Sequence, residues 1–238
     1  MSDSQIQFVD LALPRKIAVR QGSAVVAYIV KPVSEGAWFK YFDGIVSTSE
    51  RQGKEIVQHT DAMSAGIDLV EAALDIRDGG SADAPLAHKL AIVNILTSAY
   101  VPSAEETAKQ EPLPPEAVRL WTVWGAGEGN AMRRFKNLVH FFDPPTAEQY
   151  RRYRRDDSSA QVVGGSRKGM TVYRGARRTL AALYDELIVG VDGYAINGVA
   201  FGNDRELIAR HMDTYHKVAA AQGLFSAGTP EIEDEEEE

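Results

Sequence analysis

The sequence predicts an α+β fold made of two tandem related units, in each of which a β-hairpin packs on two or three helices. Three blocks of similar sequence occur twice in the chain, in the same order. In each copy, β-rich runs precede segments with apolar residues at helical spacing. A run of acidic residues at the end of the chain predicts a disordered acidic C-terminal tail, because it has too little apolar surface to bury.

The repeated blocks align without gaps, and the spacing between the two copies grows only from one block to the next. The paired blocks are Lys31–Phe42 with Asp143–Arg154 at a spacing of 112, Leu69–Gly79 with Leu183–Gly193 at 114, and His88–Ala99 with His216–Ala227 at 128. This pattern indicates a duplicated ancestral unit with insertions in the second copy. We therefore expect Trp38 to superpose on Tyr150, and His88 on His216.

The blocks divide the 238 residues into four parts. We expect a first unit with an N-terminal arm at 1–101, a linker at 102–115, a second unit with inserted loops at 116–228, and the acidic tail at 229–238. The linker has four prolines in a polar stretch and should be exposed. Internal two-fold pseudo-symmetry would place Leu69 and Leu183, and Leu74 and Ile188, in equivalent core positions.

Each unit is expected to begin with a hairpin and continue with helices. The expected strands are Ile17–Arg20 with Ala24–Val30, and Val118–Trp124 with Phe135–Phe142. Ser34 and Thr146 are suitable N-caps for a first helix in each unit. A second helix would bury Met63, Ile67, Val70 and Leu74 and end at Asp78–Gly80, and its counterpart would bury Leu180, Leu183, Leu187 and Val191 and end at Gly193. Last helices are expected at Pro85–Ala99 and Arg205–Phe225, and Arg155–Met170 reads as a loop.

Composition excludes several classes of chemistry. The chain has no cysteine, which rules out disulfides, thiolate catalysis and cysteine metal sites. It also has no apolar run near the length of a transmembrane helix. The glycine-rich Trp124–Met132 lacks the spacing of a dinucleotide fingerprint and the ending of a P-loop, so we read it as a hairpin tip. Histidines and carboxylates do not fall at metal-ligand or catalytic spacings, so we expect no catalytic residue, no metal and no cofactor.

The net charge of −8 conceals a basic region. Between Arg133 and Arg178 there are 12 basic and 4 acidic residues, whereas the last ten residues carry seven acidic ones. The candidate partner-binding residues are Arg133, Arg134, Arg151, Arg152, Arg154, Arg155, Arg167 and Lys168. They are suited to an acidic protein surface, to nucleic acid, or to the chain's own tail. Interleaved aromatics such as Tyr150 and Tyr153 have counterparts in the non-basic first copy, which favours a core role for them.

The segment "PTAEQYRRYRR" (Pro145–Arg155), after a hairpin and a proline-containing strand exit, resembles small proteins encoded in the tail modules of tailed bacteriophages, including tail assembly chaperones. The similarity covers Leu138–Arg155 and, more loosely, Ala27–Phe42. The duplicated unit and the long insertions depart from a simple chaperone, which leaves open whether the protein is a virion component or an assembly helper.

The resemblance implies a non-enzymatic structural or assembly protein of a tailed phage or phage-derived particle. Such a protein would act through protein–protein contacts with other virion or assembly proteins, and as a homo-oligomer. It would be found in the virion or in the cytoplasm of the bacterial host, without a membrane partner. The alternative is a nucleic-acid-binding protein that uses the basic second unit.

Overall fold

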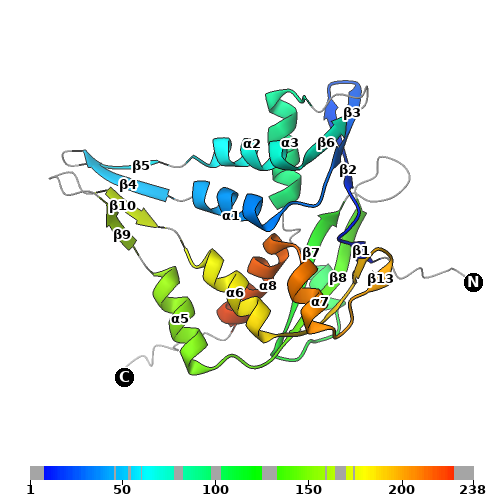
Figure 1. Ribbon diagram of the computed structural model, residues 1–238, viewed down its shortest axis with the longest axis vertical. Coiled ribbons are helices and arrows are strands. Elements are labelled where there is room, and N and C mark those ends of the chain that lie inside the picture. Colours follow the sequence, from blue (N-terminus) through cyan, green and yellow to red (C-terminus); the bar gives the residue numbers. More distant parts are fainter. Residues whose placement is uncertain are drawn as a thin grey trace, which may run out of the picture.

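Figure 1 shows the computed structural model of the chain, which confirms the predicted α+β class. The structure describes residues 8–45, 47–52, 55–59, 61–77, 83–97, 103–124, 133–158, 160–163, 170–173 and 175–227. Within these residues the strands form one four-stranded and three three-stranded sheets. The acidic tail, Arg167, Lys168 and the glycine-rich hairpin tip at 125–132 lie outside the described residues.

The first half of the chain contains a three-stranded sheet, a separate hairpin and three helices. Its elements are β2 (Arg15–Gln21), β3 (Ala24–Val30), α1 (Glu35–Gly44), β4 (Ser47–Gln52), β5 (Glu55–His59), α2 (Ala62–Ala73), β6 (Leu74–Arg77) and α3 (Leu86–Thr97). The sheet has the order β2-β3-β6 with antiparallel neighbours. The linker region then contains the short helix α4 (Ala104–Ala108), and most of its described residues are exposed.

The second half repeats this order of elements and adds a segment before its last helix. Its elements are β7 (Ala117–Trp124), β8 (Arg133–Phe142), α5 (Ala147–Asp157), β9 (Ala160–Val163), β10 (Met170–Tyr173), α6 (Arg177–Leu187), β11 (Ile188–Asp192) and α8 (Thr214–Ala227). The added segment contains β12 (Tyr194–Ile196), β13 (Val199–Ala200) and α7 (Arg205–His211). The second three-stranded sheet has the order β7-β8-β11, which matches β2-β3-β6.

Details of hydrogen bonding recur at the spacings of the sequence blocks. The sheet register shifts between Ile29 and Val30 in the first half and between Phe141 and Phe142, 112 positions on, in the second. The Lys31 amide donates to the Ala73 carbonyl, and the Asp143 amide donates to the Leu187 carbonyl, both at 2.8 Å. These pairs are again offset by 112 and 114 positions.

The first helix of each half begins as its sequence predicts. The Ser34 hydroxyl accepts the Ala37 amide at the start of α1. Thr146 and Gln149 form a reciprocal capping box at the start of α5, which satisfies two amides of the first turn.

The second helices are shorter than the sequence analysis predicts. α2 ends at Ala73 and α6 at Leu187, and the chain continues directly into β6 and β11 instead of reaching Asp78 or Gly193. The predicted face of α2 is correct only in part. Val70 is buried and Ile67 and Leu74 are half-buried, but Met63 is exposed. The buried residues of the helix are Ala65, Gly66, Leu69, Val70 and Ala73. The β6 and β11 strands complete sheets whose β3 and β8 edges would otherwise lack partners.

The prediction of a loop at Arg155–Met170 is also wrong. α5 continues to Asp157, and the chain then forms the hairpin β9–β10, which pairs with the β4–β5 hairpin of the first half in the order β5-β4-β10-β9. Short valine-rich runs such as "AQVV" favour strands once a neighbouring edge is present, although they are too short to predict alone. In Figure 1 this sheet lies at one side of the molecule, beyond α1, α5 and α6.

The predicted last helix Arg205–Phe225 is broken. α7 ends at His211 and α8 starts at Thr214, and Asp213 stands in the break. The N-terminal arm ends in β1 (Val9–Asp10), which pairs in parallel with β12 of the second half. Val9 and Leu11 are buried there, so the arm joins the two halves of the chain. The main core extends from these contacts through Trp38, Leu69, Leu183 and Phe225.

Candidate functional site

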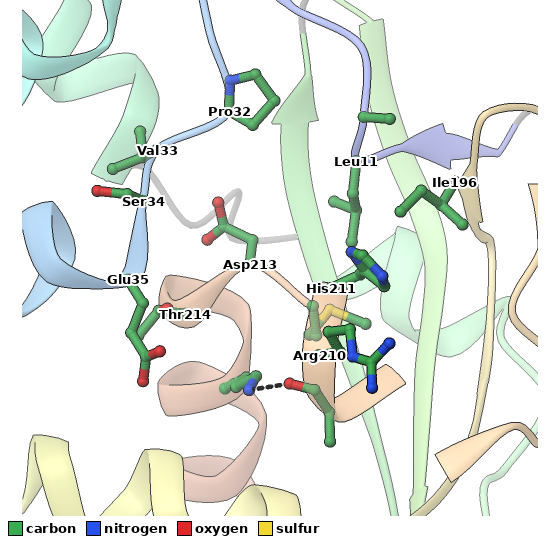
Figure 2. A pocket seen from close by; sticks show the side chains of 14 residues that line it. Leu11, Pro32, Val33, Ser34, Glu35, Ile196, Arg210, His211, Asp213 and Thr214 are labelled. Carbon is green, nitrogen blue, oxygen red and sulfur yellow. Dashed lines mark hydrogen bonds between the residues drawn. The ribbon is translucent and has the colours of Figure 1, made fainter. Parts of the chain in front are cut away.

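A cavity of about 360 Å³ opens where the two halves of the chain meet (Figure 2). Three segments form most of its walls: the arm at Leu11 and Ala12, the connection from β3 to α1 at Pro32–Glu35, and the α7–α8 break at Ala209–Thr214. Ile196 and Lys217 complete the lining. Figure 2 shows Arg210 and His211 on one side of this space and Glu35 on the other, with Asp213 between them. The cavity is therefore lined by charges of both signs.

Asp213 lines this cavity and forms hydrogen bonds with buried side chains. Its Oδ2 accepts hydrogen bonds from the Arg15 guanidinium at 3.4 Å and from the Trp38 indole at 3.3 Å, and its Oδ1 accepts the Tyr215 amide at 2.9 Å. Arg15 comes from β2 and Trp38 from α1, so one carboxylate links three segments that are distant in sequence. Burial raises the pKa of Asp213, although Arg15 and the hydrogen bonds oppose that shift. Burial also lowers the pKa of Arg15 to about 10.

A chain of four buried aromatic side chains, which we call the histidine–tyrosine chain, lies beneath this ion pair. It consists of Tyr184 on α6, His140 on β8, Tyr194 on β12 and His216 on α8. The Tyr184 hydroxyl lies 2.9 Å from His140 Nδ1, and the Tyr194 hydroxyl lies 2.9 Å from both His140 Nε2 and His216 Nδ1. Each of the four residues is fully or almost fully buried.

The histidine–tyrosine chain is satisfied when both histidines are neutral. One consistent arrangement has Tyr184 donating to His140, His140 donating to Tyr194, and Tyr194 donating to His216. Burial lowers the pKa of His140 well below its usual value and that of His216 to about 3, while it raises the pKa of both tyrosines. All four groups therefore keep their neutral form across the ordinary pH range, which favours a structural role over proton transfer to solvent.

The first half contains a simpler version of this chain. The Tyr28 hydroxyl lies 2.6 Å from His88 Nδ1, and both residues are buried. Tyr28 stands 112 positions before His140, and His88 stands 128 positions before His216. In the second half, Tyr194 of the added segment stands between His140 and His216.

The structure separates the candidate partner-binding residues. Arg151, Arg152, Arg154 and Arg155 lie together on α5, whereas Arg133 and Arg134 lie at the start of β8. A strand of ten residues spans about 30 Å, and the other end of β8 leads into α5, so the two groups do not form one patch. Arg167 and Lys168 lie outside the described residues.

The arginines on α5 differ in their surroundings. Arg152 donates to Glu186 at 2.7 Å, and Arg155 to Asp156 at 3.1 Å. Arg151 and Arg154 are exposed, and the Arg154 guanidinium lies 6.0 Å from the centre of the Tyr153 ring. Tyr150 and Tyr153 pack against Phe225, at ring-centre distances of 5.1 and 5.2 Å. Tyr153 is buried in the core and Tyr150 is half-buried against it, in agreement with the sequence analysis.

Sequence reasoning missed both the Asp213 ion pair and the histidine–tyrosine chain. The one available signal was that His88 and His216 fall in a repeated block. Tyr28 and His140 differ by 112 positions, the offset of the Lys31–Phe42 block, but stand just before that block and its counterpart. Arg15 and Trp38 are 198 and 175 positions from Asp213, and no local pattern relates them.

Comparison with known proteins adds no assignment. No protein-family model matches the chain, and no curated protein and no solved structure matches it either. Within the described residues, no group of three or more histidines, aspartates and glutamates is arranged to hold a metal ion. In the same residues, none of the helices combines the length and apolar character needed to cross a membrane.

Proposed function

We propose that the protein is a non-enzymatic structural or assembly protein, of the kind encoded in the tail modules of tailed phages or phage-derived particles, and that it acts through protein–protein contacts. The observation that carries the proposal is the four-stranded sheet β5-β4-β10-β9. Its outer strands, β5 and β9, each pair on one side only within the described residues. Unpaired strand edges expose backbone donors and acceptors that readily pair with another polypeptide.

The central site supports the same proposal. The ionisable groups beneath the cavity are engaged with one another: Asp213 with Arg15 and Trp38, and the histidines with tyrosines. Lys217, which also lines the cavity, donates to Asp185 and to the Ala209 carbonyl. An arrangement of this kind joins the two halves of the chain, as a scaffold for partners requires.

The proposal is tested by deleting the gene from the phage or prophage genome that encodes it. We expect electron microscopy to show particles with absent or incomplete tails, and the intact chain supplied in trans to restore them. Mass spectrometry of purified particles then separates a virion component, which is retained, from an assembly helper, which is absent. Infectious particles of normal appearance from the deletion strain would contradict the proposal.

Nucleic-acid binding remains the second candidate, because Arg151, Arg154 and Arg155 are exposed on α5. Phosphate contacts weaken steeply as salt rises, whereas apolar protein interfaces do not. If this candidate is correct, deleting Glu231–Glu238 raises the affinity for DNA at low salt, and alanine at Arg151, Arg152, Arg154 and Arg155 abolishes the gain. Equal, weak binding by the full and shortened chains would contradict it.

A further inference from the structure

The four-stranded sheet β5-β4-β10-β9 contains a contact between two hairpins that provides a template for contact between molecules. β4 of the first half pairs antiparallel with β10 of the second, with Tyr173 opposite Ser47 and Met170 opposite Glu50. The four strands make their substantial contacts with one another and extend beyond the helices that precede and follow them (Figure 1). The contact between β4 and β10 is therefore formed mainly by strand pairing.

The two hairpins correspond strand by strand. β4 and β9 each follow the first helix of their half, and β5 and β10 each precede the second helix. Thr48 pairs with His59 in the first hairpin and Ala160 with Tyr173 in the second. These positions differ by 112 and 114, the offsets found in the sequence blocks. The central contact thus joins β4, the first strand of its hairpin, to β10, the second strand of the other hairpin.

The outer edges of the sheet present the same two kinds of strand. β5 is the second strand of its hairpin, and β9 is the first strand of the other hairpin. Because all neighbours in the order β5-β4-β10-β9 are antiparallel, β5 and β9 run in opposite directions. A second molecule in the same orientation would therefore bring its β9 antiparallel to β5 of the first, and the alternation would continue.

We propose that copies of this chain join head-to-tail, with β5 of one molecule paired to β9 of the next in the geometry of the internal β4–β10 contact. The offsets of 112 and 114 translate the internal register into Ile56 opposite Val162, Val57 opposite Gln161, and Gln58 opposite Ala160. The joint pairs two different surfaces, so it builds a ring if the rotation between copies closes and a filament if it does not. The inference rests on the proposed function, for which it identifies a second copy as the partner.

Head-to-tail pairing satisfies both edges of the sheet, whereas a two-fold contact between two β5 strands would leave β9 open. The strands are short, with five residues in β5 and four in β9. We therefore expect an association that depends on protein concentration and strengthens when many copies are held together.

Disulfide trapping tests the joint, and the chain has no cysteine that would interfere. The variants Val57→Cys and Gln161→Cys are purified separately, mixed at high concentration and oxidised. The expected result is a covalent dimer from the mixture and little from either variant alone. The double variant should give a ladder of larger species or one closed ring. A bond within one molecule is excluded, because strands at opposite edges of a four-stranded sheet are about 14 Å apart.

The matched control is Val57→Cys mixed with Val162→Cys, which shifts the pair by one residue and turns the two side chains to opposite faces. It should trap several-fold less dimer, and all variants should melt at the temperature of the original chain. Efficient dimerisation of Val57→Cys alone would overturn the proposal in favour of a two-fold contact. Absence of dimer from the matched mixture would overturn it outright. Neither result touches the proposed function, which fails only if gene deletion leaves the particles intact.

Discussion

The Lys217 ammonium group lies 2.7 Å from the Asp185 carboxylate, and the lysine side chain is only 8% exposed. Lys89 makes the same contact with Glu71, at positions 128 and 114 residues earlier, where the side chains are 15% and 53% exposed. The same ion pair therefore occurs in both halves of the chain, at the offsets of the sequence blocks, and it is less exposed to solvent in the second half. Burial raises the pKa of Asp185 in spite of Lys217, so the pair does not fully offset its own desolvation.

Replacing Asp185 with asparagine should lower the free energy of unfolding by about 1–3 kcal/mol, because it leaves the buried Lys217 with the Ala209 carbonyl as its remaining hydrogen-bond partner among the described residues. Urea denaturation at pH 7 measures the loss. The matched control is Glu71→Gln, which should change stability by less than about 0.5 kcal/mol because that pair is more exposed. Equal losses in the two variants would show that burial does not distinguish the pairs.

Stability should fall as the pH drops below about 6.5, because the unfolded chain then protonates histidines that stay neutral in the folded protein. Burial lowers the pKa of His140 and lowers the pKa of His216 to about 3. Stability should therefore fall over the pH range that extends from about 6.5 down toward the pKa values of the folded protein. In this pH range, protonation of His140 and of His216 in the unfolded chain each lowers the free energy of unfolding by about 1.4 kcal/mol per pH unit. Asp213 acts in the opposite direction, since its raised pKa adds stability as the pH falls through the folded-state value.

His216→Asn isolates one histidine from these combined effects. Between pH 7 and pH 5, the slope of the unfolding free energy against pH should be smaller than in the original chain by about 1.4 kcal/mol per pH unit. His211→Asn is the control, because His211 is exposed and outside the histidine–tyrosine chain. The interpretation is wrong if both variants retain the original slope.

Two glycines in α1 should respond in opposite ways to alanine. A Cβ at Gly44 would lie 2.5 Å from the Ala65 Cβ of α2, whereas a Cβ at Gly36 would meet nothing within 4 Å. Gly44→Ala should therefore lower stability by about 1–3 kcal/mol, since the two helices must separate. Gly36→Ala should raise stability, by up to about 1 kcal/mol, through helix propensity. Thermal unfolding of the two variants checks the prediction, and a stabilised Gly44→Ala would show that the helices separate at little cost.

The sequence predicts single helices and strands well where long periodic runs or caps mark them. The Ser34 and Thr146 caps and the flanking strands are found where expected. The buried face of α2 was predicted only in part, because a pattern of large apolar residues gives no weight to Ala65 and Gly66. In the structure these small residues let α2 approach its neighbours: a Cβ at Gly66 would lie 3.0 Å from Val93 of α3.

Other features depend on contacts that a single sequence does not reveal. β6 and β10 are strands of four residues that pair with β3 and β4, which lie elsewhere in the chain. At the break between α7 and α8, Asp213 binds Arg15 from the opposite end of the chain. The local pattern of apolar residues is compatible with one long helix there, and it gives no sign of this distant partner.

The last prediction concerns the attachment of the N-terminal arm. The Asp10 carboxylate accepts the amides of Ala12, Asn197 and Gly198, at 3.0, 3.1 and 2.7 Å, and so ties the arm to the turn between β12 and β13. Asn197 and Gly198 have φ values of 51° and 78°, which are required by this tight turn and which orient both amides toward the carboxylate. Asp10→Ala removes three charge-assisted hydrogen bonds.

We expect Asp10→Ala to lower the free energy of unfolding by about 1–3 kcal/mol and to speed proteolysis of the arm before Arg15. Asp10→Asn keeps one acceptor oxygen and should show a smaller loss. Leu13→Ala is the control for the arm itself, because Leu13 is 50% exposed and its truncation should cost less than about 0.5 kcal/mol. If Asp10→Ala unfolds like the original chain while the arm is cut equally slowly, strand pairing of β1 with β12 and burial of Val9 hold the arm without the carboxylate.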